Sequence, residues 1–259
     1  MERNEHWGRL SAGLVLAIVV TLAGCDAESA APARDAATTP GAGDAGQDDD
    51  QPRRCRAPAG VSDAPHSIAQ VVELLNALPM PVTLPCFLES LARPLSLHAA
   101  NSEFSAQPAV GARSPRIFLF FDPLILSIAP AGPGAVLVEF GEQRSATTSL
   151  KAELQFPIEQ RLDAEAPYRR LEFVTSTTAC GVCHQGEKPA ADVGLPLAVI
   201  SPALRPLPNQ YVPISRLLAE LESCEPAEDP ARCELLDALL RLRPAPIERA
   251  FPMTFNTFF

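Results

Sequence analysis

Two cysteines and a histidine stand together in the run Cys180-Gly181-Val182-Cys183-His184, which has the pattern C-x-x-C-H. Two thiols at this spacing can add to the two vinyl groups of one haem, and the imidazole that follows can ligate the iron. The run therefore predicts one covalent haem c, held by Cys180 and Cys183, with His184 as an iron ligand. The sequence contains no second C-x-x-C-H run, which excludes a multihaem wire within this chain.

The same three residues also allow chemistry without haem. Cys180 and Cys183 could form a small disulfide with each other, or they could bind zinc together with His184 and a fourth ligand. A thioredoxin-like role is less well supported, because the strand–motif–helix context that it needs is missing. We take haem as the first interpretation because the whole C-x-x-C-H pattern is present and an export signal precedes it.

The N-terminus has the order of regions typical of an exported protein. A short apolar stretch, residues 10–20, follows two arginines, is too short to span a bilayer comfortably and ends at small residues. Leu22-Ala23-Gly24-Cys25 resembles the lipobox of bacterial lipoproteins. That resemblance implies a signal peptide over residues 1–24 and a lipidated Cys25 at the mature N-terminus. An ordinary secretory signal is the alternative.

The segment from 25 to 54 consists largely of Ala, Gly, Pro, Thr and Asp, and it predicts a disordered tether because it has almost no large apolar side chains. Between Cys25 and Gln51 seven acidic residues oppose one arginine, so most of the net charge of −10 belongs to the tether. No basic patch indicates a nucleic-acid partner. We therefore expect a protein anchored by lipid to the inner or outer membrane of the cell envelope, facing the periplasm or the surface.

Four cysteines remain besides Cys25, which is assigned to the lipid, and Cys180 and Cys183, which are assigned to the haem. An even number in an oxidising compartment is typical of disulfides. Pairing by proximity along the chain predicts the disulfides Cys55–Cys86 and Cys224–Cys233.

The hydrophobic pattern predicts helices near both ends of the folded part and strands between them. Apolar residues at helical spacing indicate a helix from Ile68 to Leu78, a short one over 86–91, and two more over 212–221 and 230–242. Runs typical of strands cover residues 116–121, 124–128, 135–140, 150–158 and 168–175.

The strand over 150–158 alternates apolar residues with Lys151 and Glu153, which predicts one wet face. We expect an α+β fold with an antiparallel, sandwich-like or barrel-like body. A β-rich domain over 55–175 carries the N-terminal helix. Residues 176–259 form a motif loop and a helical region packed on the same body, and the aromatic tail folds back.

Residues 180–184 resemble the haem-attachment motif of c-type cytochromes, and the resemblance covers little more than these five residues. It implies one-electron transfer by a single haem c. In the monohaem members a methionine some tens of residues after the histidine supplies the second axial ligand, often before Pro-x-Phe. Met253, in Phe-Pro-Met-Thr-Phe, has a similar setting, although packing between its aromatic neighbours is the other interpretation.

His98 is a weaker alternative for the second ligand, and an open iron position is a third possibility. The large β-rich region before the motif is foreign to small helical cytochromes, so we expect the haem on a different scaffold. The sequence favours an electron carrier over an enzyme, because it shows no nucleophile–base pair, paired carboxylates or HExxH run. A haem-free lipoprotein that acts as a binding module is the competing function, and the redox partner in the envelope is not indicated.

Overall fold

The computed structural model describes residues 53–101, 107, 111, 113–174 and 177–257, and the account of the fold refers to these. The predicted signal peptide, Cys25 and most of the tether lie outside the described residues. Within the described ranges no helix is long and apolar enough to cross a membrane.

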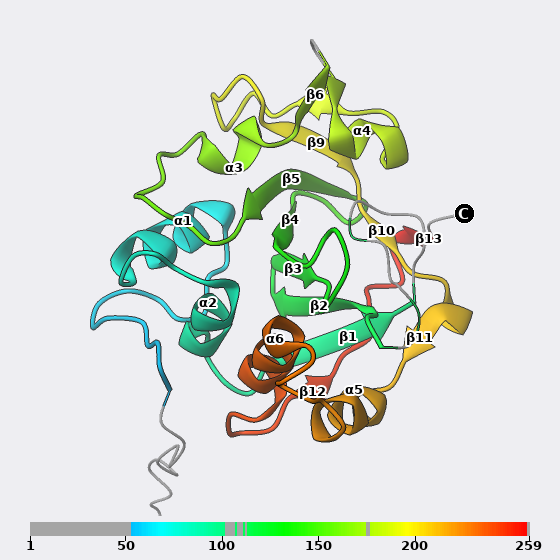
Figure 1. The fold of residues 1–259 in the computed structure, drawn as a ribbon. Helices are drawn as coiled ribbons and strands as arrows, with labels where there is room; N and C mark the ends of the chain where they lie inside the picture. The colour runs from blue at the N-terminus through cyan, green and yellow to red at the C-terminus, as the bar shows by residue number, and fades with distance from the viewer. Residues whose placement is uncertain (1–52, 102–106, 108–110, 112, 175–176, 258–259) are drawn as a thin grey trace, which may run out of the picture. The chain divides into compact units, whose positions relative to one another are not determined.

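A nine-stranded sheet forms the centre of the fold, and its strands run in the order β11-β1-β2-β3-β4-β5-β9-β8, with β12 beside β1 (Figure 1). Neighbouring strands are antiparallel except for the parallel pair β1–β12. The strands are β1 (Ser96–Ala100), β2 (Arg116–Phe121), β3 (Leu124–Ile128), β4 (Leu137–Gln143), β5 (Thr148–Gln155), β8 (Lys188–Pro189), β9 (Val199–Pro202), β11 (Tyr211–Val212) and β12 (Ile247–Glu248).

Two small ribbons and six helices complete the described part of the chain. The ribbons pair β6 (Glu172–Val174) with β7 (Thr177–Thr178), and β10 (Leu204–Arg205) with β13 (Asn256–Thr257). The helices are α1 (Ile68–Ala77), α2 (Leu84–Ser90), α3 (Ala166–Arg169), α4 (Ala179–Cys183), α5 (Ile214–Glu222) and α6 (Pro230–Leu240), and a single 3-10 turn covers Pro208–Gln210.

Local signals in the sequence set the helix starts. The Ser67 hydroxyl accepts a hydrogen bond from the Gln70 amide at the start of α1, and the Thr83 hydroxyl accepts one from Cys86 at the start of α2. Asp229 caps α6 in the same way, and Pro230 supplies a preset backbone angle at its first position. These caps are local, because each joins a side chain to a backbone amide three residues further on.

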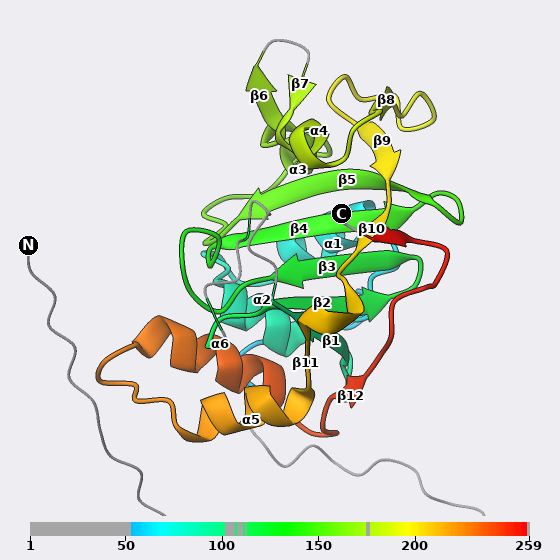
Figure 2. The ribbon, with the colours of Figure 1, turned by 90° about the vertical axis from the view of Figure 1, so that its right-hand side faces the viewer.

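The two faces of the sheet have different partners, because successive side chains of a strand point to opposite faces. One face carries aliphatic residues such as Leu97, Leu119 and Leu126, and these are buried in one large core with residues of α1, α2 and α6. Figure 2 shows α1 and α2 behind the sheet, while the chain from β9 through β10 to β11 crosses in front of it.

The front face is covered by two segments that run side by side. The first, residues 203–210, which we call the strap, links β9, the second strand from one edge of the sheet, to β11 beside β1. The second, residues 249–257, which we call the tail, pairs with the strap through β10 and β13. The Arg205 Nε atom donates to the Phe255 carbonyl at 3.0 Å and ties the two together. Phe251 and Phe255 of the tail form a second, smaller core with Phe118 and Phe120 of the sheet.

The predicted fold class is confirmed: the structure is α+β, with one mostly antiparallel sheet that stays open rather than closing into a barrel. The ranges expected for the strands β2 and β3 agree with the structure. The strand predicted over 168–175 is partly wrong, because Tyr168 belongs to the helix α3 and only Glu172–Val174 is a strand. Pro167 favours the first turn of a helix, which the pattern of apolar residues did not reveal.

Both predicted disulfides are confirmed. Cys55 bonds to Cys86 with a Cα–Cα distance of 5.2 Å, and Cys224 bonds to Cys233 with a Cα–Cα distance of 5.6 Å. The first disulfide ties the start of the described chain to α2, and the second joins the end of α5 to α6.

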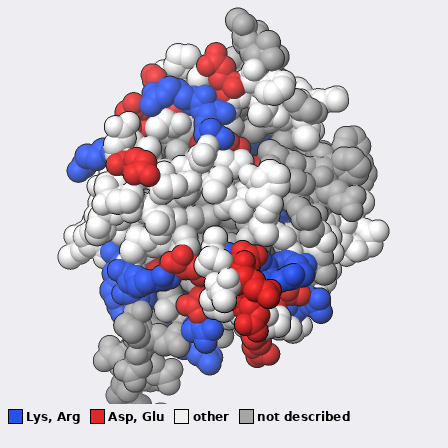
Figure 3. All heavy atoms as spheres, viewed as in Figure 1, with Lys and Arg blue, Asp and Glu red and all other residues white. Residues whose placement is uncertain are grey.

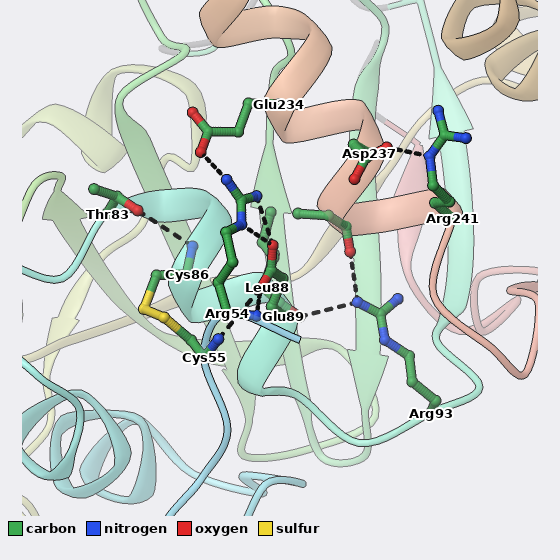
Figure 4. Close-up of polar contacts among 11 residues, drawn as sticks. Arg54, Cys55, Thr83, Cys86, Leu88, Glu89, Arg93, Glu234, Asp237 and Arg241 are labelled. Carbon is green, nitrogen blue, oxygen red and sulfur yellow. Dashed lines mark hydrogen bonds and ion pairs between the residues drawn. A yellow bond between two sulfur atoms is a disulfide. The ribbon is translucent and has the colours of Figure 1, made fainter. Parts of the chain in front are cut away.

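Arg54 strengthens the same junction between the start of the body and the helices (Figure 4). Its Nε atom donates to the Glu89 carboxylate at 2.8 Å, and its backbone amide donates to the other Glu89 oxygen at 2.7 Å. The guanidinium also pairs with Glu234 of α6. Arg93 bridges α2 and α6 by donating to the carbonyls of Leu88 and Ala238. Figure 3 shows charged side chains of both signs gathered around α5 and α6.

The Glu89→Ala variant tests how much this junction contributes to stability. The Glu89 carboxylate is buried, and its loss leaves the Arg54 backbone amide and Nε atom without their acceptor, while the guanidinium keeps only Glu234. We expect the free energy of unfolding in urea to fall by about 2 kcal/mol. Glu234→Ala is the matched control, because its half-exposed ion pair contributes at most about 0.5 kcal/mol. Equal losses in the two variants would contradict this assignment.

Candidate functional site

The C-x-x-C-H run lies on the short helix α4, where we had expected a loop. The Thr178 hydroxyl caps this helix by accepting a hydrogen bond from the Gly181 amide at 3.2 Å. The Ala179 amide donates to the Leu171 carbonyl at 2.8 Å, which joins the start of α4 to the β6–β7 ribbon. Preceding threonines with poor helix propensity hid this helix in the sequence, because they belong to β7 and to the cap rather than to the helix itself.

Gly181 lets a carboxylate approach the turn between the two cysteines. A Cβ atom at this position would lie 2.7 Å from Glu187 Oε2, closer than real Cβ contacts occur. The other Glu187 oxygen accepts a hydrogen bond from the Thr178 hydroxyl. The glycine between the cysteines therefore has a packing reason that is independent of any haem.

Both cysteines of the run carry free thiols in the structure, so they are not bridged to each other. Burial raises the pKa of the Cys180 thiol to about 12, and the negative charge of Glu139 adds to this effect. Cys180 is therefore a protonated thiol at neutral pH. A protonated thiol is a poor nucleophile, which argues against a thioredoxin-like exchange reaction at this position.

His184 ends α4, and its imidazole is held in one orientation. The Nδ1 atom lies 2.8 Å from the Pro202 carbonyl oxygen. Because a carbonyl only accepts, Nδ1 carries the proton, and the lone pair of Nε2 stays available to a ligand. Burial lowers the pKa of His184 to about 3, and the nearby Lys151 contributes to this. The imidazole is therefore neutral near pH 7, which is the form that binds metals.

A cavity of about 80 Å³ lies between α4, the front face of the sheet, the strap and the tail. Cys180 and His184 line it from one side, and Phe251 and Phe255 of the tail close it from another. The sheet contributes a polar group of residues to its wall: Arg116, Ser127, Glu139, Ser149 and Lys151. The cavity thus brings the C-x-x-C-H run against polar and charged residues from four strands.

Lys151 of the cavity wall is buried, and Arg116 and Glu139 are half-buried, which corrects the expectation of a wet face on β5. Lys151 is 8% exposed, and burial lowers its pKa to about 8. Arg116 pairs with Glu139 and donates a hydrogen bond of 2.8 Å to the Ser127 hydroxyl. Glu153 is also buried, and burial together with the neighbouring Glu139 raises its pKa. The strand β5 alternates apolar and polar residues as predicted, but its polar face packs towards the strap and α4 instead of contacting water.

The structure does not bring either candidate for a second iron ligand to His184. Met253 exposes 80% of its surface and does not line the cavity, although Phe251 and Phe255 on either side of it do. Four strand spacings, about 19 Å, separate the strand of His98 from that of Lys151.

His98 lies instead in an aromatic cluster. Its ring packs on Phe251 at 5.0 Å and on Tyr211 at 5.4 Å, and its Nδ1 atom donates to the Arg249 carbonyl at 3.1 Å.

The structure does not support the alternative that the C-x-x-C-H run binds zinc. Among the residues with described positions, no three His, Cys, Asp or Glu side chains are grouped so that they could hold a metal ion. A single haem iron needs only one protein ligand besides the thioethers, so this finding does not bear on haem.

Sequence reasoning missed the residues that surround the C-x-x-C-H run. Pro202, Lys151, Arg116 and Glu139 come from segments 18 to 68 positions away from His184, and no spacing rule connects them. Comparison of the chain with protein-family models, with curated proteins and with solved structures finds no significant match.

The reactivity of Cys180 tests the environment of the site. A thiol with a pKa of about 12 has, at pH 8, about a thousand-fold less thiolate than one with a pKa of 9. We expect iodoacetamide to modify Cys180 of the folded, haem-free chain at least a hundred-fold more slowly than in the urea-unfolded chain with its disulfides intact. Peptide mass spectrometry follows the reaction, and equal rates in both states would refute the burial of the thiol.

Proposed function

We propose that this protein is a membrane-anchored c-type haem protein that transfers single electrons in the cell envelope. Cys180 and Cys183 would hold the haem through thioether bonds, and Nε2 of His184 would ligate the iron. The observation that carries the proposal is the hydrogen bond from His184 Nδ1 to the Pro202 carbonyl. Such a bond fixes the tautomer and orientation of a metal-binding imidazole.

The state of the two thiols supports the same proposal. Both are unpaired although two disulfides form elsewhere in the chain, and both belong to the five-residue helix α4. A haem bound there would supply an iron that cycles between two oxidation states and so carries one electron. The contribution of the chain is a neutral nitrogen ligand in a site largely withdrawn from water.

The cavity beside His184 is too small for a porphyrin as it stands. Ligand pockets for molecules of that size have volumes of roughly 300–1,000 Å³, whereas this cavity has about 80 Å³. The proposed haem therefore requires either that Phe251 and Phe255 move aside or that it lies outside the cavity against α4. Movement of the tail would carry Met253 with it, which keeps Met253 as the candidate for the second iron ligand.

The predicted lipid on Cys25 and the tether complete the proposal. A flexible segment of about thirty residues lets a folded body explore the space near the membrane surface. An electron carrier needs such contact with a donor and an acceptor, which we place in the same envelope. A haem-free lipoprotein that binds a ligand is the second candidate, and the cavity with polar and charged residues in its wall is the observation that favours it.

Covalent haem is tested directly by producing the full chain in a bacterium that attaches haem c. We expect haem staining on a denaturing gel, an intact mass increased by one haem, and modified Cys180 and Cys183 in the peptide map. The Cys180→Ser/Cys183→Ser double variant is the control and keeps both structural disulfides. Unmodified or mutually bridged cysteines in the native lipoprotein would reject the proposal.

The second ligand is tested in the haem-loaded chain. The mature chain has only two methionines, Met80 and Met253, which gives a matched pair of variants. We expect Met253→Leu to abolish the low-spin absorption spectrum of the reduced protein while the haem stays bound, because the iron loses its sulfur ligand. Met80→Leu leaves the spectrum unchanged. An unaltered spectrum in Met253→Leu would exclude Met253 as a ligand.

A further inference from the structure

Lys151 is a buried amino group with too few acceptors. It is 8% exposed, and its Nζ atom donates one long hydrogen bond, of 3.4 Å, to the Pro202 carbonyl. The same carbonyl already accepts the proton of His184 Nδ1. With the residues that the structure describes, Lys151 makes no other hydrogen bond and no ion pair. An ammonium group has three donors, and burying it without a counterion is costly.

Two of the carboxylates near Lys151 pair with other cations, and a third, Glu187, lies outside the cavity lining and accepts a hydrogen bond from the Thr178 hydroxyl. Glu139 pairs with Arg116, and Glu153 pairs with Arg170 at 3.0 Å. The lining of the cavity therefore carries two positive groups, Arg116 and Lys151, against one negative group, Glu139. The lining residues alone therefore have an excess of one positive charge, which favours a ligand with a single negative charge.

The opposite strand leaves room for such a ligand. Gly141 of β4 pairs with Lys151 in register and has no side chain to fill the space in front of the amino group. A Cβ atom added at Gly141 would lie 3.5 Å from Ser149 Oγ, which is an ordinary van der Waals contact. A methyl group therefore fits at this position without a clash. The Ser149 hydroxyl lines the same cavity and has no hydrogen-bond partner among the described residues.

We propose that this cavity binds a carboxylate group, which accepts hydrogen bonds from Lys151 Nζ and Ser149 Oγ. A volume of about 80 Å³ admits a few non-hydrogen atoms, which is the size of formate or acetate or of one carboxylate arm of a larger molecule. A monoanion fits the excess of one positive charge better than sulfate or phosphate does. The carboxylate could come from a free small acid or from a propionate side chain of haem. The free-acid form stands without haem, and the propionate form rests on the proposed function.

The composition of the chain makes the test selective, because its only two lysines are Lys151 and Lys188. Lys188 lies on β8 and is exposed, so it is an internal control. We propose to label the full, haem-free chain with [13C]lysine and to follow the two Hε–Cε signals during titration with sodium formate and sodium acetate. Sodium chloride holds the ionic strength constant. We expect a saturable shift of the Lys151 signal and no saturable shift of the Lys188 signal.

Variants assign the signals and separate the site from the fold. Lys151→Met removes one signal and abolishes the calorimetric binding of acetate, whereas Lys188→Met keeps the binding. Gly141→Ala retains every polar group but places a methyl group in the cavity, and we expect at least ten-fold weaker binding. Because the added Cβ makes only ordinary contacts, this variant is expected to fold even if Lys151→Met does not.

A second arm uses the haem-loaded chain and identifies the propionate source. If haem-free protein shows no saturable shift, the midpoint potential of the haem is measured against pH in the wild type and in Lys151→Met. A propionate held by Lys151 titrates at higher pH once the ammonium is gone, so the break in that plot moves upward. Binding in the haem-free chain supports the free-acid form, and a moved break supports the propionate form. No binding together with an unmoved break, or with a chain that takes up no haem, overturns the carboxylate site.

Discussion

The burial of a polar sheet face is the constraint on which the site depends. The strap and the tail cross the front of the sheet, and Phe251 and Phe255 cover part of it. Burial disfavours charge on three groups at this face, so it raises the pKa of Cys180 and lowers the pKa values of His184 and Lys151. One structural cause therefore produces a neutral thiol, a neutral imidazole and an under-partnered amine within one small volume.

The parts of the fold that follow from local rules could be predicted from the sequence. The apolar runs of β2 and β3, the Asp229-Pro230 start of α6 and the two disulfides between neighbouring cysteines each depend on residues close together in the chain. The two-residue strands β10 to β13 could not be predicted, because pairs of residues are too short to show a period. Their partners lie far away in the sequence, and only the folded chain selects them.

In the candidate site, too, the local features could be predicted from the sequence and the long-range contacts could not. The C-x-x-C-H run is a local signal, and the sequence alone predicts haem there, with zinc or a disulfide as alternatives. The burial of Lys151 is not local, because an alternating strand has the same pattern whether its polar face meets water or a strap. The acceptor for His184 is equally invisible in the sequence, since the Pro202 carbonyl belongs to the backbone of β9 and not to any side-chain motif.

The two proposals are connected through the Pro202 carbonyl, which accepts hydrogen bonds from both His184 and Lys151. An unpaired positive charge beside an iron ligand favours the reduced iron and so raises its reduction potential, and a bound carboxylate would cancel that charge. By linkage, the oxidised form would then bind the carboxylate more tightly than the reduced form. A haem at His184 and a carboxylate at Lys151 would therefore be energetically coupled, and the cavity would act as a control on the electron carrier rather than as a separate feature.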